Sequence, residues 1–500
     1  MGIIKRQGLK SMIVNFLGAF IGVFASLYIY TSNDDIYGYA QFLYSTALLF
    51  MPFATMGILS LVVKYFPHFE KSDAKKFNGF LSLILISLLV VFSIFTLTFF
   101  LFKDAIYAFL ESLNMKAELL NNSEGILLVL TFFLVISTFL THHSTNKLRT
   151  VVPSILNQLG YKIFLPLLVL AYVYFEFSKS TFGYGVAFFF FAVSVLLVVY
   201  LYLIDGLKFG KIKRPSSDFS YWEMAKYSIF GSLNQLGNAL AFRLDNIMIA
   251  LFLTSDDVSF YFKAFLFTSL IEMPLRSFNQ IASPILSKAW NDNNLIELKN
   301  IYQKTSVNLF VTGCFLFLGL WYCLGDLVNI SVDPTKYPFI KEIFLLIGLS
   351  KLMDMVTSVN NQIIAYSKFY KYNLIFLIFL GVTNILMNFY LIPIHGIVGA
   401  AIATSISIFV YNIIKLLFII VKFKMQPFSG GTVKTLILFL FVFGLSFIVP
   451  FNFSPFINII LKSIFVAAIY LPLAYFWNIS KDINKLVLET KNVITSRLWN

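Results

Sequence analysis

Charged residues are scarce in this chain. They make up 12% of its 500 residues, whereas soluble proteins average about 25%. Apolar residues account for 59% of the sequence, and apolar runs of about 18 residues or more recur throughout it. This composition excludes an ordinary soluble domain and predicts an all-α polytopic membrane protein. The segments between the apolar runs are too short to fold around a core of their own, which removes the usual setting of a soluble catalytic unit.

Cysteine and histidine are also rare. Cys314 and Cys323 lie in one apolar segment and are interpreted as small hydrophobic residues. His142, His143 and His395 lack a third ligand at metal-binding spacing. The sequence contains no glycine-rich phosphate-binding loop. We therefore expect no metal, no other cofactor and no ATP-driven pump.

The apolar pattern predicts fourteen membrane spans. They lie at about 11–31, 40–63, 79–102, 125–141, 151–175, 182–204, 227–253, 257–284, 305–325, 338–364, 373–393, 397–421, 434–450 and 456–478.

Basic residues gather in alternate connections between these spans. The connections of the other set contain little beyond Lys103, Lys116, Lys179 and Lys336. Because cytoplasmic loops carry an excess of lysine and arginine, this bias predicts that both termini are cytoplasmic. It also accounts for the net charge of +14 without nucleic acid as a partner.

An internal repeat divides the chain into two halves. Residues 32–36, followed by Met51-Pro52, align without gaps with residues 254–258, followed by Met273-Pro274. Both halves begin on the same side, so the repeat is parallel. The predicted division is an N-lobe at 1–207, a cytoplasmic linker at 208–226, a C-lobe at 227–421, and two extra helices with a cytoplasmic tail at 422–500.

The second half carries charges inside its apolar segments. Its seventh and eighth spans contain Arg243, Asp245, Lys263, Glu272 and Arg276. A charge facing lipid at the bilayer centre costs roughly 2.5 to 3.5 kcal/mol. These side chains are therefore expected to face protein or water, and such charges often line a path.

Helical periodicity gathers polar residues into one stripe on each of four spans. The stripes contain Ser154, Gln158 and Lys162 on the fifth span; Asn234, Gln235, Asn238, Asp245 and Asn246 on the seventh, with Arg243 at the edge; Thr268, Glu272, Arg276, Asn279 and Ser283 on the eighth; and Lys351, Asp354, Ser358, Asn361 and Gln362 on the tenth. Together they predict a shared water-filled cavity.

Lys162 and Arg243 have no same-helix carboxylate in register, so they are the leading candidates for attracting an anion. Asp245 is a candidate site for a coupling ion or proton, although a salt bridge to a basic neighbour explains it equally well. Glu272–Arg276 and Lys351–Asp354 have helical spacing for ion pairs, which are either functional or only structural.

Pro52 and Pro274 occupy equivalent places in the repeat and predict kinks, either in a gate or in fixed bends. The acidic pairs Asp34-Asp35 and Asp256-Asp257 suggest a metal-dependent glycosyltransferase, but they are interpreted as helix caps because their turns are short.

The chain resembles the bacterial polysaccharide repeat-unit flippases of the O-antigen and capsule type, within the multidrug/oligosaccharidyl-lipid/polysaccharide exporter superfamily. The resemblance rests on residues 34–39 with Pro52, on residues 64–67 and 244–248, and on the small-residue stretch 396–403. It covers essentially the whole chain.

This resemblance implies two six-helix lobes around a central cavity, two additional helices and alternating access in the bacterial inner membrane. The implied substrate is an oligosaccharide on undecaprenyl diphosphate, and a polymerase and other polysaccharide-assembly proteins are possible partners. The basic cavity residues would then be Lys162, Arg243, Arg276 and Lys351, with Asn234, Asn238, Asn279 and Asn361 suited to sugar hydroxyls. The alternatives are a multidrug antiporter of a related branch and a membrane polymerase or glycosyltransferase.

Overall fold

A computed structural model of the chain describes residues 14, 17–71, 79–147, 149–204, 206–207, 220–331, 337–480, 482 and 484–485. Every regular element in these ranges is a helix, which confirms the predicted all-α class. Contacts group the chain into two compact units. Unit 1 comprises residues 1–262 and 381–400, and unit 2 comprises residues 263–380 and 401–500. Because this grouping does not test the internal repeat, the N-lobe, linker and C-lobe boundaries remain predictions.

Unit 1 begins with an apolar helix at Leu17–Ser32. It continues with α2 (Asp34–Thr55), α3 (Ile58–Lys71), α4 (Phe80–Ser112), α5 (Glu118–Asn121), α6 (Glu124–Asn146), α7 (Val151–Ser154), the π-helical turn η2 (Ile155–Leu159), α8 (Gly160–Phe175), α9 (Lys179–Leu203), α10 (Tyr221–Phe242) and α11 (Leu244–Phe252). Helix α6 packs against α2, α3 and α9, and α10 packs against α2 and α3.

A sharp bend separates α2 from α3. The two helices meet at 65°, and the joining residues Met56 and Gly57 have positive φ angles of 42° and 75°. A Cβ at Gly57 would lie 1.9 Å from the carbonyl oxygen of Ser228 on α10, so glycine is required for both conformation and space. Pro52 lies inside α2, which continues to Thr55. The described break therefore follows the proline instead of coinciding with it.

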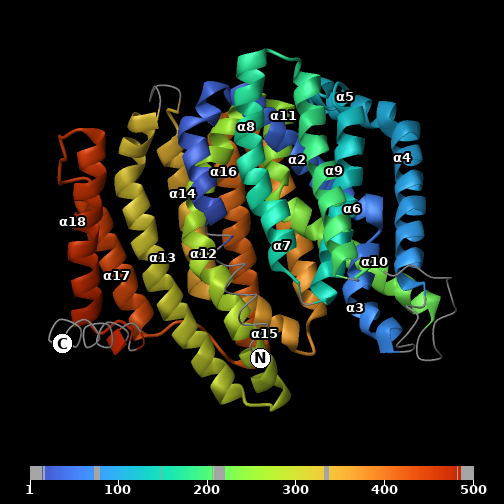
Figure 1. Cartoon of the computed structure of the whole chain (residues 1–500). Coiled ribbons are helices and arrows are strands. Elements are labelled where there is room, and N and C mark those ends of the chain that lie inside the picture. Colours follow the sequence, from blue (N-terminus) through green and yellow to red (C-terminus); the bar gives the residue numbers. More distant parts are fainter. Residues whose placement is uncertain are drawn as a thin grey trace. The chain divides into compact units, whose positions relative to one another are not determined.

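Unit 2 contains most of α12 (Ser255–Asn291), followed by α13 (Leu295–Ser331), α14 (Ile340–Thr357), α15 (Asn360–Tyr366), both ends of α16 (Lys371–Phe423), α17 (Gly430–Leu445) and α18 (Pro455–Phe476). The middle of α16, residues 381–400, belongs to unit 1. Helix α13 packs against α14, α17 and α18 (Figure 1). Gly396, with φ 58° and ψ −139°, interrupts the helical backbone of α16. This interruption falls between the predicted spans 373–393 and 397–421.

Eight described helices are long and apolar enough to cross a membrane, or nine if the bent α2–α3 pair is one span. The predicted segments at 11–31, 227–253, 338–364 and 434–450 fall on shorter or interrupted helices. The structure thus supports a multi-pass membrane protein, whereas the count of fourteen remains a prediction.

Candidate functional site

A hollow of about 390 Å³ in unit 1 brings Arg243 and Asn238 together, as the polar stripe predicts. Its polar lining comes from two helices: Thr138 and His142 lie on α6, and Gln235 and Asn238 lie on α10, with Arg243 at the end of α10. The apolar lining consists of Leu48, Met51, Pro52, Leu59, Ala239 and Phe242. A partly apolar pocket with a few converging polar groups is typical of a small-molecule site. We refer to it as the Arg243 cavity.

Arg243 lies where the seventh predicted span is broken. Its backbone (φ −127°, ψ −16°) is not helical, and it separates α10 from α11. The centre of its guanidinium group lies 5.6 Å from the centroid of the Tyr44 ring. That contact is a cation–π interaction, which holds an arginine in place without neutralising its charge.

Hydrogen bonds orient the polar side chains around Arg243, one within α10 and the others between neighbouring helices. Gln235 Oε1 accepts a long hydrogen bond from Thr55 Oγ1 (3.4 Å), and Asn238 Nδ2 donates to the carbonyl of Asn234 (2.8 Å). Asn234 itself is exposed. His142 Nδ1 lies 3.2 Å from the carbonyl of Leu59. Sequence reasoning considered His142 only as a metal ligand and missed its place beside the stripe of α10.

Lys162 does not line the Arg243 cavity. It is half-buried on α8, where a Cβ on Gly18 would lie 3.5 Å from its Nζ. Asp245 is buried on α11, two residues after Arg243, and belongs to a different set of contacts. Its carboxylate accepts hydrogen bonds from Tyr261 Oη (2.7 Å) and Asn388 Nδ2 (2.8 Å).

The surroundings of Asp245 are rich in oxygen because Asn388 also bonds Asn384 Oδ1. Hard cations prefer such ligands, so a coupling role for Asp245 remains a prediction that this chemistry allows. Within the described ranges, no group of three or more histidine, cysteine, aspartate or glutamate side chains is placed to hold a metal ion. The two asparagines were missed, although their i,i+4 spacing inside an apolar span was a usable signal.

Unit 2 contains a cluster of charged side chains on α12 and α14. Lys351 Nζ lies 2.9 Å from Glu272 Oε2 and 3.8 Å from Asp354 Oδ2. Arg276 lies 3.5 Å from Glu272 and is 66% exposed. Both contacts suggested by helical spacing are therefore present, but the shortest ion pair joins the two helices. We call these four residues the unit 2 charge cluster.

Residues of α16 complete the surroundings of this cluster. Asn412 Nδ2 donates to Asp354 Oδ1 at 2.7 Å. Lys415, one helical turn further on, is buried, and its Nζ lies 4.2 Å from the centroid of the Tyr411 ring. Sequence reasoning missed both residues, although a lysine inside the predicted span 397–421 was visible in the sequence.

The remaining predicted residues of unit 2 lie apart from the short ion pair. Asn361 is exposed, and its Oδ1 accepts a hydrogen bond from Tyr411 Oη (3.2 Å). Asn279 Oδ1 is buried and has no hydrogen-bond partner among the described residues. Pro274 lies inside the continuous helix α12.

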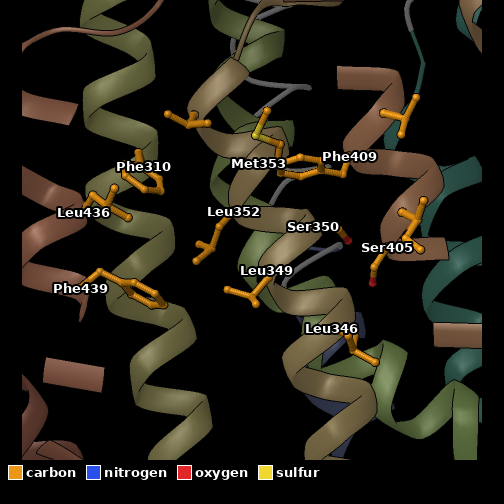
Figure 2. A pocket seen from close by; sticks show the side chains of 13 residues that line it. Phe310, Leu346, Leu349, Ser350, Leu352, Met353, Ser405, Phe409, Leu436 and Phe439 are labelled. Atoms are coloured by element: carbon orange, nitrogen blue, oxygen red, sulfur yellow. The ribbon is translucent and has the colours of Figure 1, made fainter. Parts of the chain in front are cut away.

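A second hollow, of about 490 Å³, lies in unit 2 and has an apolar lining (Figure 2). Leu349, Leu352 and Met353 of α14 face it together with Phe310, Phe409 and Phe439 from neighbouring helices. Its only hydroxyl-bearing residues are Ser350 and Ser405. This lining suits an apolar group and offers nothing to bind an anion.

The acidic pairs lie in the first turns of α2 and α12, where they suit the helix dipole. Their capping role is partly different from the prediction. The side chain of Asn33 accepts the Ile36 amide, and Thr254 Oγ1 accepts the Asp257 amide. Asp35 instead pairs with Lys179 at 2.8 Å.

Comparisons with known structures identify the fold. The structure of lipid II flippase MurJ in an inward closed conformation matches with a TM-score of 0.66 and 17% identity, covering 93% of this chain and 98% of that one. An inward-facing multidrug resistance MATE transporter of the MOP superfamily matches with a TM-score of 0.60 and 15% identity, covering 83% and 94%. A MATE transporter of Vibrio cholerae matches with a TM-score of 0.53 and 10% identity, covering 83% and 97%. No curated protein sequence matches significantly.

The sequence itself matches a family model described as polysaccharide biosynthesis protein over residues 33–290, which is just over half of the chain. This match agrees with the resemblance found in the sequence. The chain therefore belongs to the polysaccharide biosynthesis protein family, and its fold is that of the MurJ and MATE proteins.

Proposed function

We propose that this protein is a flippase that moves oligosaccharide repeat units linked to undecaprenyl diphosphate across the bacterial inner membrane by alternating access. The product would be O-antigen, capsule or exopolysaccharide. The proposal places both termini in the cytoplasm and makes a polymerase and other polysaccharide-assembly proteins its functional partners. Family membership and a MurJ-like fold support the general class of flippase or transporter.

The Arg243 cavity is the observation that carries this proposal. It places one arginine beside two carboxamides and a histidine within a largely apolar wall. Arginine binds phosphate oxygens in a planar, bidentate manner, and carboxamides both donate to and accept from sugar hydroxyls. A diphosphate carrier with attached sugars has both phosphate oxygens and sugar hydroxyls.

A direct test measures transport by the purified full-length protein in proteoliposomes, with a fluorescent undecaprenyl-diphosphate oligosaccharide as substrate. We expect Arg243→Gln to reduce the flipping rate about tenfold or more, because a charge-assisted hydrogen bond is lost. Arg243→Lys should retain intermediate activity. Arg149→Gln is the matched control, because Arg149 is exposed and does not line the cavity.

The same variants can be tested in cells by restoring surface glycan in a strain that lacks the flippase. Loss of display with normal protein abundance is the expected result for Arg243→Gln. Wild-type transport and display in that variant would overturn the assignment of the cavity.

A small-molecule antiporter is the second candidate, favoured by the likeness to MATE transporters. The basic character of the Arg243 cavity argues against cationic drugs as substrates. Drug efflux from vesicles without oligosaccharide flipping would favour the antiporter. Sugar transfer by the purified protein would instead favour a membrane polymerase or glycosyltransferase.

A further inference from the structure

Lys415 is a buried lysine that forms no short ion pair with any described residue. The residue is 2% exposed. In the ranges that the structure describes, its ammonium group forms no hydrogen bond and no ion pair within 4.0 Å; it lies over the Tyr411 ring at 4.2 Å, and the Asp354 carboxylate is its electrostatic neighbour at longer range. An aromatic face compensates only part of the cost of burying a charge. Such a residue therefore suggests an anion supplied from elsewhere.

The nearby carboxylates are already engaged. Glu272 pairs with Lys351, and Asp354 receives both Asn412 and the more distant Lys351. With Lys415 included, the unit 2 charge cluster has three basic side chains and two acidic ones. One positive charge is therefore left over, and Lys415 is the buried lysine that forms no ion pair.

A short chain of contacts connects Lys415 to an exposed group. Its ammonium lies over the ring of Tyr411, whose hydroxyl donates to Asn361 Oδ1 at 3.2 Å. Asn361 is exposed at the start of α15. Because its oxygen accepts from Tyr411, its amide hydrogens remain suited to donate to an incoming acceptor.

We propose that Lys415, Tyr411 and Asn361 form an anion-binding subsite in unit 2 that takes a phosphate group. Lys351, which the sequence suggests as a substrate-binding cation, is then a fixed partner of Glu272 and Asp354. A lysine ammonium binds phosphate as a compact point charge with three donors. Assigning the phosphate to a carrier lipid rests on the proposed function, whereas the anion subsite itself does not.

Binding measurements on the full-length protein in nanodiscs test this subsite. The probes are inorganic pyrophosphate, undecaprenyl diphosphate and phosphatidylglycerol. We expect Lys415→Met to weaken pyrophosphate and undecaprenyl diphosphate binding about tenfold or more, and Lys415→Arg to retain most of the affinity. Lys422→Met is the matched control, because Lys422 lies on the same helix, is exposed, and also has its Nζ near an aromatic ring, 5.6 Å from the centroid of Phe369. This control should bind like the wild type.

Wild-type affinity of a folded Lys415→Met protein for both diphosphates would overturn the proposal. If that variant does not fold, Asn361→Ala replaces it, because Asn361 is exposed; a loss of about threefold or more supports the subsite, and no change overturns it. Equal competition by phosphatidylglycerol would overturn the assignment to the carrier lipid.

The outcome can be separated from that of the proposed function. Diphosphate binding that depends on Lys415 in a protein that flips no oligosaccharide would uphold the subsite and reject the flippase. Unchanged binding in Lys415→Met, with flipping that still depends on Arg243, would do the reverse.

Discussion

The Arg243 cavity and the unit 2 charge cluster place similar residues in opposite electrostatic situations. Arg243 lies on an aromatic face among carboxamides, and no acidic residue lines its cavity. Lys351 is buried between two carboxylates that match its charge. A charge inside an apolar helix is therefore not sufficient evidence of a binding site. Under the proposed function, the nearest counter-ion distinguishes Arg243, a group that binds substrate, from Lys351, a group that joins two helices.

The largest expected effect is on stability. Lys351→Met leaves the partly buried carboxylates of Glu272 and Asp354 without their shared cation, and breaking a buried ion pair by removing one partner costs about 3 to 5 kcal/mol. We expect a strongly lowered Tm in nanodiscs. The double variant Lys351→Met/Glu272→Gln should recover part of the loss, because one of the two stranded charges is removed. An unchanged Tm in the single variant would contradict the structural role of Lys351, on which the comparison with Arg243 depends.

Lys415→Met should act in the opposite direction. Replacing a buried cation that has no short ion pair with an apolar side chain of similar length removes the desolvation penalty of that charge, which is on the order of several kcal/mol before compensation. The Tm should therefore rise while diphosphate binding falls. A Tm decrease comparable to that of Lys351→Met would mean that Lys415 is a structural cation as well.

The smallest expected effect concerns a neutral group of the Arg243 cavity. Asn238→Ala removes one carboxamide without changing charge, so we expect a reduction of about two- to tenfold in oligosaccharide flipping with an unchanged Tm. Asn234→Ala is the control, because Asn234 is exposed and does not line the cavity. Equal losses in the two variants would mean that the cavity lining does not decide sugar recognition.

The sequence predicted the helical class and membrane character correctly because long apolar runs depend only on local composition. It also placed Asn238 on a polar stripe with Arg243 just beyond its edge, since helical periodicity fixes which residues share a face; both residues line one cavity. The Glu272–Lys351 pair was not predictable from spacing, because it depends on how α12 and α14 pack. Lys415 is visible in the sequence, but it is the one charged residue of the predicted span 397–421, so helical spacing assigns it no charged partner.

The bend after α2 illustrates another limit. Pro52 was the expected kink, yet proline fixes only its own φ and removes one donor. The chain turns at Met56-Gly57, where two positive φ values are required. The glycine was a signal for that turn, but only the close approach of the Ser228 carbonyl shows why no other residue fits.

The same bend has a mechanical consequence. Ser228 and Ser232 of α10 donate hydrogen bonds to the carbonyls of Met56 (2.7 Å) and Pro52 (2.8 Å). These two hydrogen bonds attach α10 to the bend at the end of α2. Both α2 and α10 contribute residues to the lining of the Arg243 cavity. Straightening the bend between α2 and α3 would break both hydrogen bonds at once and shift α2 relative to α10. The width of the Arg243 cavity therefore depends on the backbone angles at Met56 and Gly57. A substitution that makes this bend more rigid would change ligand binding in the cavity.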